Sequence, residues 1–170
     1  MGSQDIMMAS RLYHMRDLKA EIAKLKAENS RLSEKLSTLE AHFDMALLAA
    51  EDLRSLKEGE KMLVVDGWNL ILGSKREASS REELCQAVQS RIDSGEYKKA
   101  WVVFDGPKEN VKVSGSLRLS YTGGDGEHRA DKFICDYIRM AKYLAIESRV
   151  DVWTNDKDFL KTVDRIKNRI

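Results

Sequence analysis

Cysteine, proline and long apolar runs are all scarce in this sequence. The chain has two cysteines and one proline among its 170 residues. Two cysteines cannot form a network of disulfides, so we expect a protein of the reducing cytoplasm. No apolar run approaches the roughly 18 residues that a membrane-spanning helix requires, so we expect no membrane partner. The first residues also lack the basic-then-apolar order of a secretory signal peptide.

The chain has almost no net charge. Its 29 Lys and Arg residues nearly balance its 28 Asp and Glu residues, which leaves a net charge of +1. This balance excludes a strongly basic nucleic-acid wrapper and a strongly acidic tail, but it permits a local basic face. Charged residues make up 34% of the chain, above the usual share of about 25%. We therefore expect one long element to be exposed to solvent.

Glycine, proline and aromatic residues are nearly missing from the first third of the chain. Nine of the ten glycines, the single Pro107 and most aromatic residues lie from Gly59 onward. A segment without helix breakers and with few large rings favours one long helix over a globular core. The sequence therefore predicts a helix over residues 5–57 and a globular domain over residues 60–170.

Apolar residues in the predicted helix follow a seven-residue repeat, which is typical of a coiled coil. The d positions are Leu18, Leu25, Leu32 and Leu39, and the a positions are Met15, Ile22, Asn29, Leu36 and Phe43.

Charged residues beside this repeat favour a parallel pair of helices. Glu21 would face Lys26 of the second helix, and Lys35 would face Glu40. Asn29 is a polar residue of the kind that sets the register of a two-stranded coiled coil. We predict a parallel homodimer through residues 15–43. A helix folded back on its own domain, an antiparallel pair and a higher assembly remain alternatives.

The globular part alternates β-rich runs with helical patterns. Runs of apolar residues without polar interruption indicate strands that are buried on both faces, and alternation with helices indicates a parallel sheet. We predict an α/β fold, in the form of a three-layer α/β/α domain with a central parallel sheet. The predicted strands are 61–66, 100–105, 117–122 and 149–154, and the predicted helices are 81–93, 129–146 and 157–170.

Aspartates stand where these strands end. Asp66, Asp105 and Asp156 close or follow three of the runs, and Asp131 lies near the start of a predicted helix, four residues after Glu127. Ligands of open parallel sheets bind outside the carboxyl ends of the strands. A lone aspartate at such a place is usually a turn former or a helix cap, so the prediction rests on their combination. We expect these acids to meet at one edge of the sheet.

Clustered carboxylates repel one another, and a hard cation removes that repulsion. Mg²⁺ and Mn²⁺ prefer oxygen ligands, and such ions activate water and stabilise the leaving oxygen of a phosphodiester. The three histidines and two cysteines are scattered, which disfavours zinc. We interpret His128 as a surface residue and Trp68 as a residue of the core. The alternatives are contact of His128 with the substrate and stacking of Trp68 on a base.

Four segments together resemble the NYN domains, in the YacP-like branch of the PIN-like nucleases. The resemblance extends over roughly residues 61–160. The segments are 65–71 (VDGWNLI), similar to the family's "DGYN" motif, 102–106 (VVFDG), similar to its second strand, 120–134, similar to a strand followed by "GETAD" and a helix, and 152–156 (VWTND), similar to "VTSD".

The resemblance implies a PIN-like fold and a metal-dependent ribonuclease that uses Mg²⁺ or Mn²⁺ and cleaves RNA, expected to be single-stranded. Two positions depart from the family pattern, namely Arg129 and Lys132, whose added charges would bind phosphate or partly replace a metal. By position, Asp66, Asp131 and Asp156 would hold the metal, Asp105 and Glu127 would support it, Asn69 would orient the site, and Thr154 and Asn155 would form the turn on the phosphate side.

Other functions remain open at this point. The main alternative is a non-catalytic module that binds RNA or a protein and is recruited to a partner or to the ribosome through the coiled coil. A small-molecule phosphatase is disfavoured because Gly67 and Trp68 follow Asp66, where such enzymes carry a second aspartate two residues later. Carboxylate–metal chemistry does not by itself distinguish RNA from DNA, so a DNA nuclease also remains possible.

Overall fold

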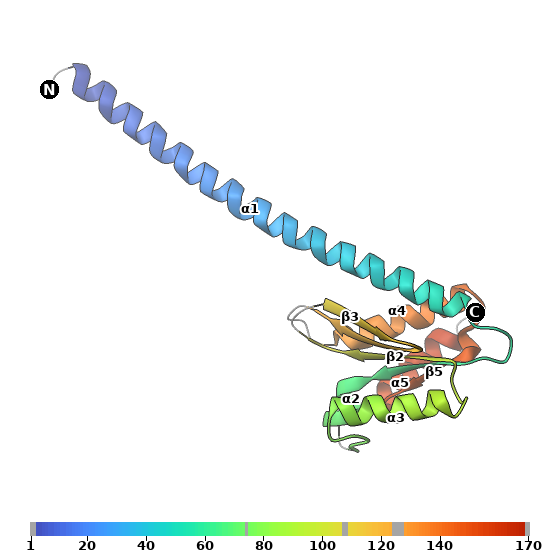
Figure 1. Ribbon diagram of the computed structural model, residues 1–170. Helices are drawn as coiled ribbons and strands as arrows, with labels where there is room; N and C mark the ends of the chain where they lie inside the picture. The colour runs from blue at the N-terminus through green and yellow to red at the C-terminus, as the bar shows by residue number, and fades with distance from the viewer. Residues whose placement is uncertain (1–2, 74, 107–108, 124–127, 169–170) are drawn as a thin grey trace. The chain divides into compact units, whose positions relative to one another are not determined.

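The fold is described from a computed structural model, which describes residues 3–73, 75–106, 109–123 and 128–168 (Figure 1). In chain order the elements are α1 (Ser3–Arg54), β1 (Met62–Asp66), α2 (Gly67–Leu72), α3 (Arg81–Asp93), β2 (Lys99–Phe104), β3 (Glu109–Ser114), β4 (Leu117–Thr122), α4 (Arg129–Tyr143), η1 (Glu147–Arg149), β5 (Val150–Trp153) and α5 (Lys157–Asn168). Among the described residues, no helix is long and apolar enough to cross a membrane.

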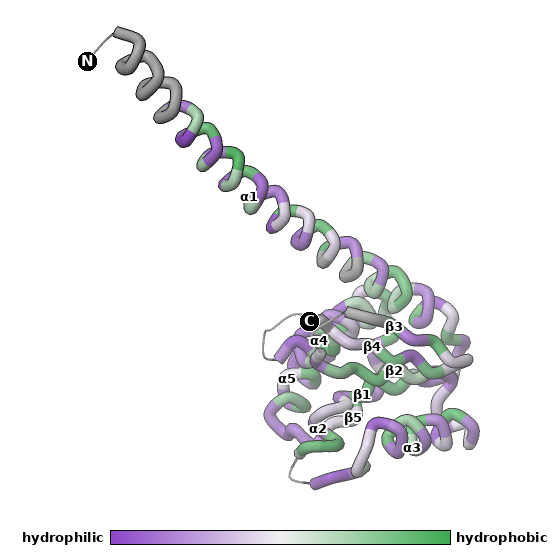
Figure 2. The backbone as a smooth tube through the Cα atoms, turned by 60° about the vertical axis from the view of Figure 1, so that its left-hand side comes forward, coloured by the Kyte–Doolittle hydropathy of each residue, from purple (hydrophilic) through white to green (hydrophobic). Residues whose placement is uncertain are grey.

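The chain divides into two compact units, Met1–His42 and Phe43–Ile170. The first unit is helical throughout its described part, as the absence of glycine and proline predicts. Polar and apolar residues alternate along this helix, as the colours of α1 in Figure 2 show. The apolar side chains at the a and d positions from Met15 to Phe43 are between 45% and 64% exposed in the single chain.

The second unit contains a five-stranded, mostly parallel sheet in the order β3-β4-β2-β1-β5. Strands β5, β1, β2 and β4 pair in parallel, with Met62 opposite both Lys99 and Val150. The predicted α/β class and parallel pairing are therefore confirmed for the four expected strands. The fifth strand, β3, was not expected, and it pairs antiparallel to β4 at the edge. Its turn uses Gly115 at a φ of 59°, which glycine adopts without strain.

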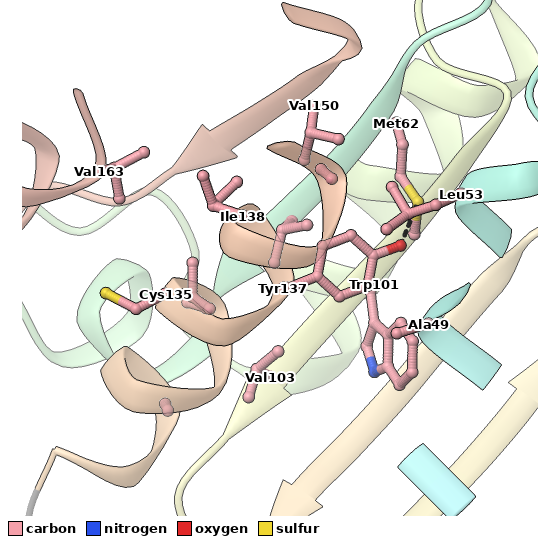
Figure 3. Packing of buried hydrophobic residues seen from close by; sticks show 14 of the residues in the cluster. Ala49, Leu53, Met62, Trp101, Val103, Cys135, Tyr137, Ile138, Val150 and Val163 are labelled. Carbon is pink, nitrogen blue, oxygen red and sulfur yellow. Dashed lines mark hydrogen bonds between the residues drawn. The ribbon is translucent and has the colours of Figure 1, made fainter. Parts of the chain in front are cut away.

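Helices cover both faces of this sheet, which is compatible with a three-layer α/β/α arrangement. One apolar cluster joins β1 and β2 to α4, α5 and the end of α1, and a second joins the same strands to α2 and α3. Figure 3 shows the first cluster, in which the hydroxyl of Tyr137 donates a hydrogen bond of 2.7 Å to the sulfur of Met62. The alternation of faces along β1 explains the two clusters, because Met62 and Val64 point to one and Leu63 and Val65 to the other.

The globular unit begins earlier than the sequence indicates. We expected it from residue 60, but Ala49 and Leu53 of α1 are buried in its core. Asp52, only 1% exposed, also ties α1 to the sheet. Its carboxylate accepts hydrogen bonds from Nε and Nη2 of Arg118 and from Nζ of Lys99. A buried carboxylate is tolerated when it is paired in this way. The last turns of α1 therefore belong to the domain.

Candidate functional site

The parallel pairing of β5, β1 and β2 brings the ends of these strands together at one edge of the sheet. An open hollow of about 340 Å³ lies there. Ten residues line it: Asp66, Trp68, Asn69, Leu72, Gly73, Asp105, His128, Ala130, Asp131 and Asp156. Five of the predicted site residues, the four aspartates and Asn69, thus meet around one space although they are up to 90 positions apart in the chain. Glu127 lies outside the described residues.

Asp66 is the most buried carboxylate of the hollow, with 6% of its surface exposed. It is the last residue of β1 and the N-cap of α2, and it accepts a hydrogen bond from the backbone N–H of Asn69 (3.4 Å) and from the hydroxyl of Thr154 (3.1 Å). Burial raises its pKa from 3.8 to about 6, against these two hydrogen bonds, and the charges of Asp131 and Asp105 add to the rise. The site therefore holds a carboxyl that titrates close to neutral pH.

Asp105 connects the end of β2 to the start of α4. One of its oxygens accepts hydrogen bonds from the Thr122 hydroxyl (2.9 Å) and from the backbone N–H of Ala130 (2.7 Å). The helix has no side-chain cap of its own at His128, so Asp105 satisfies one of the free N–H groups of its first turn. This contact places Asp131, the next residue of α4, at the hollow.

Asp131 lies beside His128, which has the left-handed backbone conformation at a φ of 60°. Such a conformation is uncommon for residues other than glycine and often marks a functional site. Nδ1 of His128 is 3.2 Å from a carboxylate oxygen of Asp131. Burial raises the pKa of Asp131, the contact with His128 opposes the rise, and the charges of Asp156 and Asp105 add to it.

Asp156 and the two residues before it form the turn between β5 and α5. Asp156 caps α5, because one of its oxygens accepts from the N–H groups of Asp158 and Phe159, each at 2.9 Å. The N–H of Asn155 donates to the side-chain oxygen of Asn69 over 2.7 Å. Thr154 is buried and its hydroxyl is hydrogen-bonded to Asp66. Thr154 therefore holds a carboxylate in place, and phosphate binding by this turn stays a prediction.

The two basic residues that depart from the family pattern do not line the hollow. Arg129 is half-buried and donates to the carbonyl oxygen of Thr122 over 3.1 Å, which fixes it to the end of β4. Lys132 is exposed on α4. Among the described lining residues the hollow thus carries four acids and no Lys or Arg.

The metal site predicted at Asp66, Asp131 and Asp156 stays a prediction. No group of three or more His, Cys, Asp or Glu side chains in the described part of the chain is arranged to hold a metal ion. The donor chemistry nevertheless suits a hard cation that keeps part of its water shell, since Mg²⁺ is usually held by only one or two carboxylates. Within the described residues, no hydrogen bond reaches the second carboxylate oxygen of Asp105, Asp131 or Asp156.

Five lining residues were not among the site residues predicted from the sequence: Trp68, Leu72, Gly73, His128 and Ala130. His128 is exposed, as we expected, yet it lines the hollow. Its spacing of three residues before Asp131 was the available signal, because residues three apart on a helix lie side by side. Trp68 and Leu72 come from α2, a short helix that was not predicted from the sequence. Trp68 packs against the core, as expected, but it also contributes to the wall of the hollow.

The comparisons with known proteins add no identification. No family model, no curated protein and no solved structure matches this chain.

Proposed function

We propose that this chain is a metal-dependent endoribonuclease of the NYN, YacP-like kind, with a PIN-like fold, which acts in the cytoplasm. The observation that supports the proposal is the convergence of Asp66, Asp105, Asp131 and Asp156 around one hollow at the strand ends. The charges of Asp131 and Asp105 raise the pKa of Asp66, and carboxylates that perturb one another in a hollow are candidates for a functional site. The oxygens offered there suit Mg²⁺ or Mn²⁺ and, through the ion, a phosphodiester.

Each residue has a defined part in the proposed reaction. Asp66, Asp131 and Asp156 would hold the ion, and Asp131 and Asp156 each have an oxygen that accepts no hydrogen bond from the described residues. A bound divalent ion supplies positive charge that polarises water and phosphate. Asp105 and Asn69 position α4 and the β5–α5 turn through the hydrogen bonds described above.

The test is cleavage of single-stranded RNA with Mn²⁺ present. We expect Asp131→Asn and Asp156→Asn to lower the rate by about 100-fold or more, because each removes a charged ligand of the ion. Asp136→Asn and Asp158→Asn are matched controls, because these exposed aspartates lie on α4 and α5 outside the hollow, and they should keep the wild-type rate. Equal rates for the wild type and both site variants would remove the nuclease proposal.

A non-catalytic module that binds RNA or a protein is the second candidate. It is favoured by the lack of a preformed three-residue metal site among the described residues and by the exposed charge of Lys132. Calorimetry separates the two functions. If the chain is a nuclease, it binds Mn²⁺ and Asp66→Asn abolishes that binding. A module that binds RNA, a protein partner or the ribosome requires no Mn²⁺ binding.

We also propose that residues 15–43 pair in parallel with a second copy of the chain. The apolar side chains of the a and d positions are roughly half exposed in the single chain. Transfer of each such side chain out of water stabilises the pair by on the order of 1 kcal/mol. In the in-register parallel pair, Glu21 faces Lys26 of the second helix and Lys35 faces Glu40, so both pairs join opposite charges.

A further inference from the structure

The hollow has an apolar wall beside its aspartates. Trp68 and Leu72 both come from α2 and both line the hollow. They are four positions apart, so they lie on the same side of the helix. A site for a metal and a phosphate alone requires no such wall, because both of those ligands are fully polar.

The indole of Trp68 is held in a defined orientation. Its Nε1–H donates to the carbonyl oxygen of Asp105 over 2.7 Å. Its ring meets that of Phe104 edge to face, with centroids 5.1 Å apart, and the Arg81 guanidinium lies 5.7 Å from its centroid. A ring that is held in this way loses little conformational entropy when a flat ligand stacks on it. The platform is therefore formed before any ligand arrives.

Leu72 remains in water at the hollow. It is 68% exposed, although the other apolar residues of α2, Leu70 and Ile71, are buried in the core. A ligand that covers an exposed leucine removes apolar surface from water, which makes the free energy of binding more favourable. Leu72 and Trp68 together thus favour a ligand with a flat, weakly polar part next to the part that carries negative charge.

We propose that Trp68 and Leu72 form a subsite that binds one unpaired base of the nucleic acid in the hollow. The inference rests on the proposed function for the phosphate beside the aspartates. A base presents a flat π-face to an aromatic side chain. In a duplex that face is covered by neighbouring bases, and exposing it costs a few kcal/mol.

A base in a strand and a free nucleotide share this chemistry, and the surroundings of the hollow favour the strand. Lys75 and Lys157 are exposed, and both lie next to the β5–α5 turn. The carbonyl oxygen of Lys75 accepts a hydrogen bond from the Asn155 side chain, and Lys157 directly follows Asp156. Charges beyond the hollow attract the phosphates of further nucleotides, which a single nucleotide does not have.

Binding of a strand that resists hydrolysis tests the inference on the full chain with Mn²⁺. The probes are a labelled 2′-O-methyl phosphorothioate RNA, the same strand annealed to its complement, and the same strand with its bases removed. Fluorescence anisotropy gives the affinity for each. We expect the single strand to bind more tightly than the other two probes, because only it offers an unpaired base.

Two variants remove the wall. We expect Trp68→Leu to weaken binding of the single strand about 5- to 100-fold, the range found when a stacking residue is truncated. Leu72→Ala should weaken it about 3- to 10-fold through the lost apolar contact. Affinity for the abasic strand and for the duplex should not change. Tyr143→Ala is the matched control, because Tyr143 is 90% exposed on α4 outside the lining of the hollow.

If Trp68→Leu disturbs the fold, Leu72→Ala still tests binding of the base, because truncating an exposed side chain leaves no cavity. Unchanged affinity of Leu72→Ala for the single strand, or equal affinity of the wild type for single strand and duplex, overturns the inference. So does displacement of the strand by AMP at concentrations equal to those of the strand. Base-dependent binding without any RNA cleavage would overturn the nuclease proposal alone.

Discussion

At the scale of single residues, the folded chain places Asp66 in an environment that disfavours its charge. Burial is the main reason that its pKa rises from 3.8 to about 6. Between these values the folded chain holds a proton that the unfolded chain releases. Protonation of Asp66 therefore contributes fully to the free energy of unfolding below about pH 4, and this contribution is lost as the pH rises through 6. The difference in pKa corresponds to at most about 3 kcal/mol at neutral pH.

We therefore expect Asp66→Asn to gain stability relative to the wild type as the pH rises. Urea unfolding in EDTA, at about pH 4.5 and about pH 7.5, measures both proteins. The stability of the variant minus that of the wild type should increase by about 1–3 kcal/mol between the two conditions. Asp158→Asn, an exposed aspartate, should show no such change. A difference that is constant with pH would mean that burial does not raise the pKa of Asp66.

Residue patterns predicted the acids of the hollow but not its apolar wall. An aspartate at the end of a buried run can be read from the sequence, because buried parallel strands are continuous apolar runs. Trp68 and Leu72 follow one such run within a short helix of six residues. Six residues are too few to show a helical period, so nothing in the pattern distinguished core residues from lining residues there.

At the scale of elements, α4 ends in a Schellman motif with alanine in the position where glycine is favoured. Ala145 has a φ of 56°, its N–H donates to the Lys142 carbonyl, and the N–H of Ile146 donates to the Ala141 carbonyl. The left-handed conformation costs a residue with a Cβ about 1–2 kcal/mol. From the sequence we expected this helix to extend to residue 146, because alanine gives no stop signal.

Ala145→Gly should stabilise the globular unit by about 0.5–1 kcal/mol, since relief of strain exceeds the greater freedom of glycine in the unfolded chain. This corresponds to a rise of about 2–4 °C in Tm. Tryptophan fluorescence is a suitable probe, because all three tryptophans lie in this unit. Ala87→Gly inside α3 should have the opposite effect, a loss of about 1 kcal/mol. A lower Tm for Ala145→Gly would contradict the account.

At the scale of the whole molecule, the proposed pairing of α1 predicts a mass of twice the 19.4 kDa of one chain. We expect Leu25→Glu combined with Leu32→Glu to give single chains, because both d positions would then bury a charge. Both side chains are 58% exposed in the single chain, so the globular unit should remain folded. Analytical ultracentrifugation measures the mass, and circular dichroism measures the fold.

Ala20→Glu combined with Ala27→Glu adds the same charge on the outer side of the helix and serves as the matched control. These f positions lie away from the a and d positions, so the control should keep the mass of two chains. A wild-type protein that sediments as one chain at every concentration would rule out the pairing.

Local composition and periodicity were enough to predict the long helix, the alternation of strands and helices, and the strand-end aspartates. Which surfaces meet became clear only in the folded chain. There the end of α1 joins the core through Ala49, Leu53 and the buried Asp52, and β3 pairs with β4. There too Trp68 and Leu72 line the same hollow as the aspartates. The physical reason is that packing between residues distant in the chain depends on shape and burial in three dimensions, which no local period encodes.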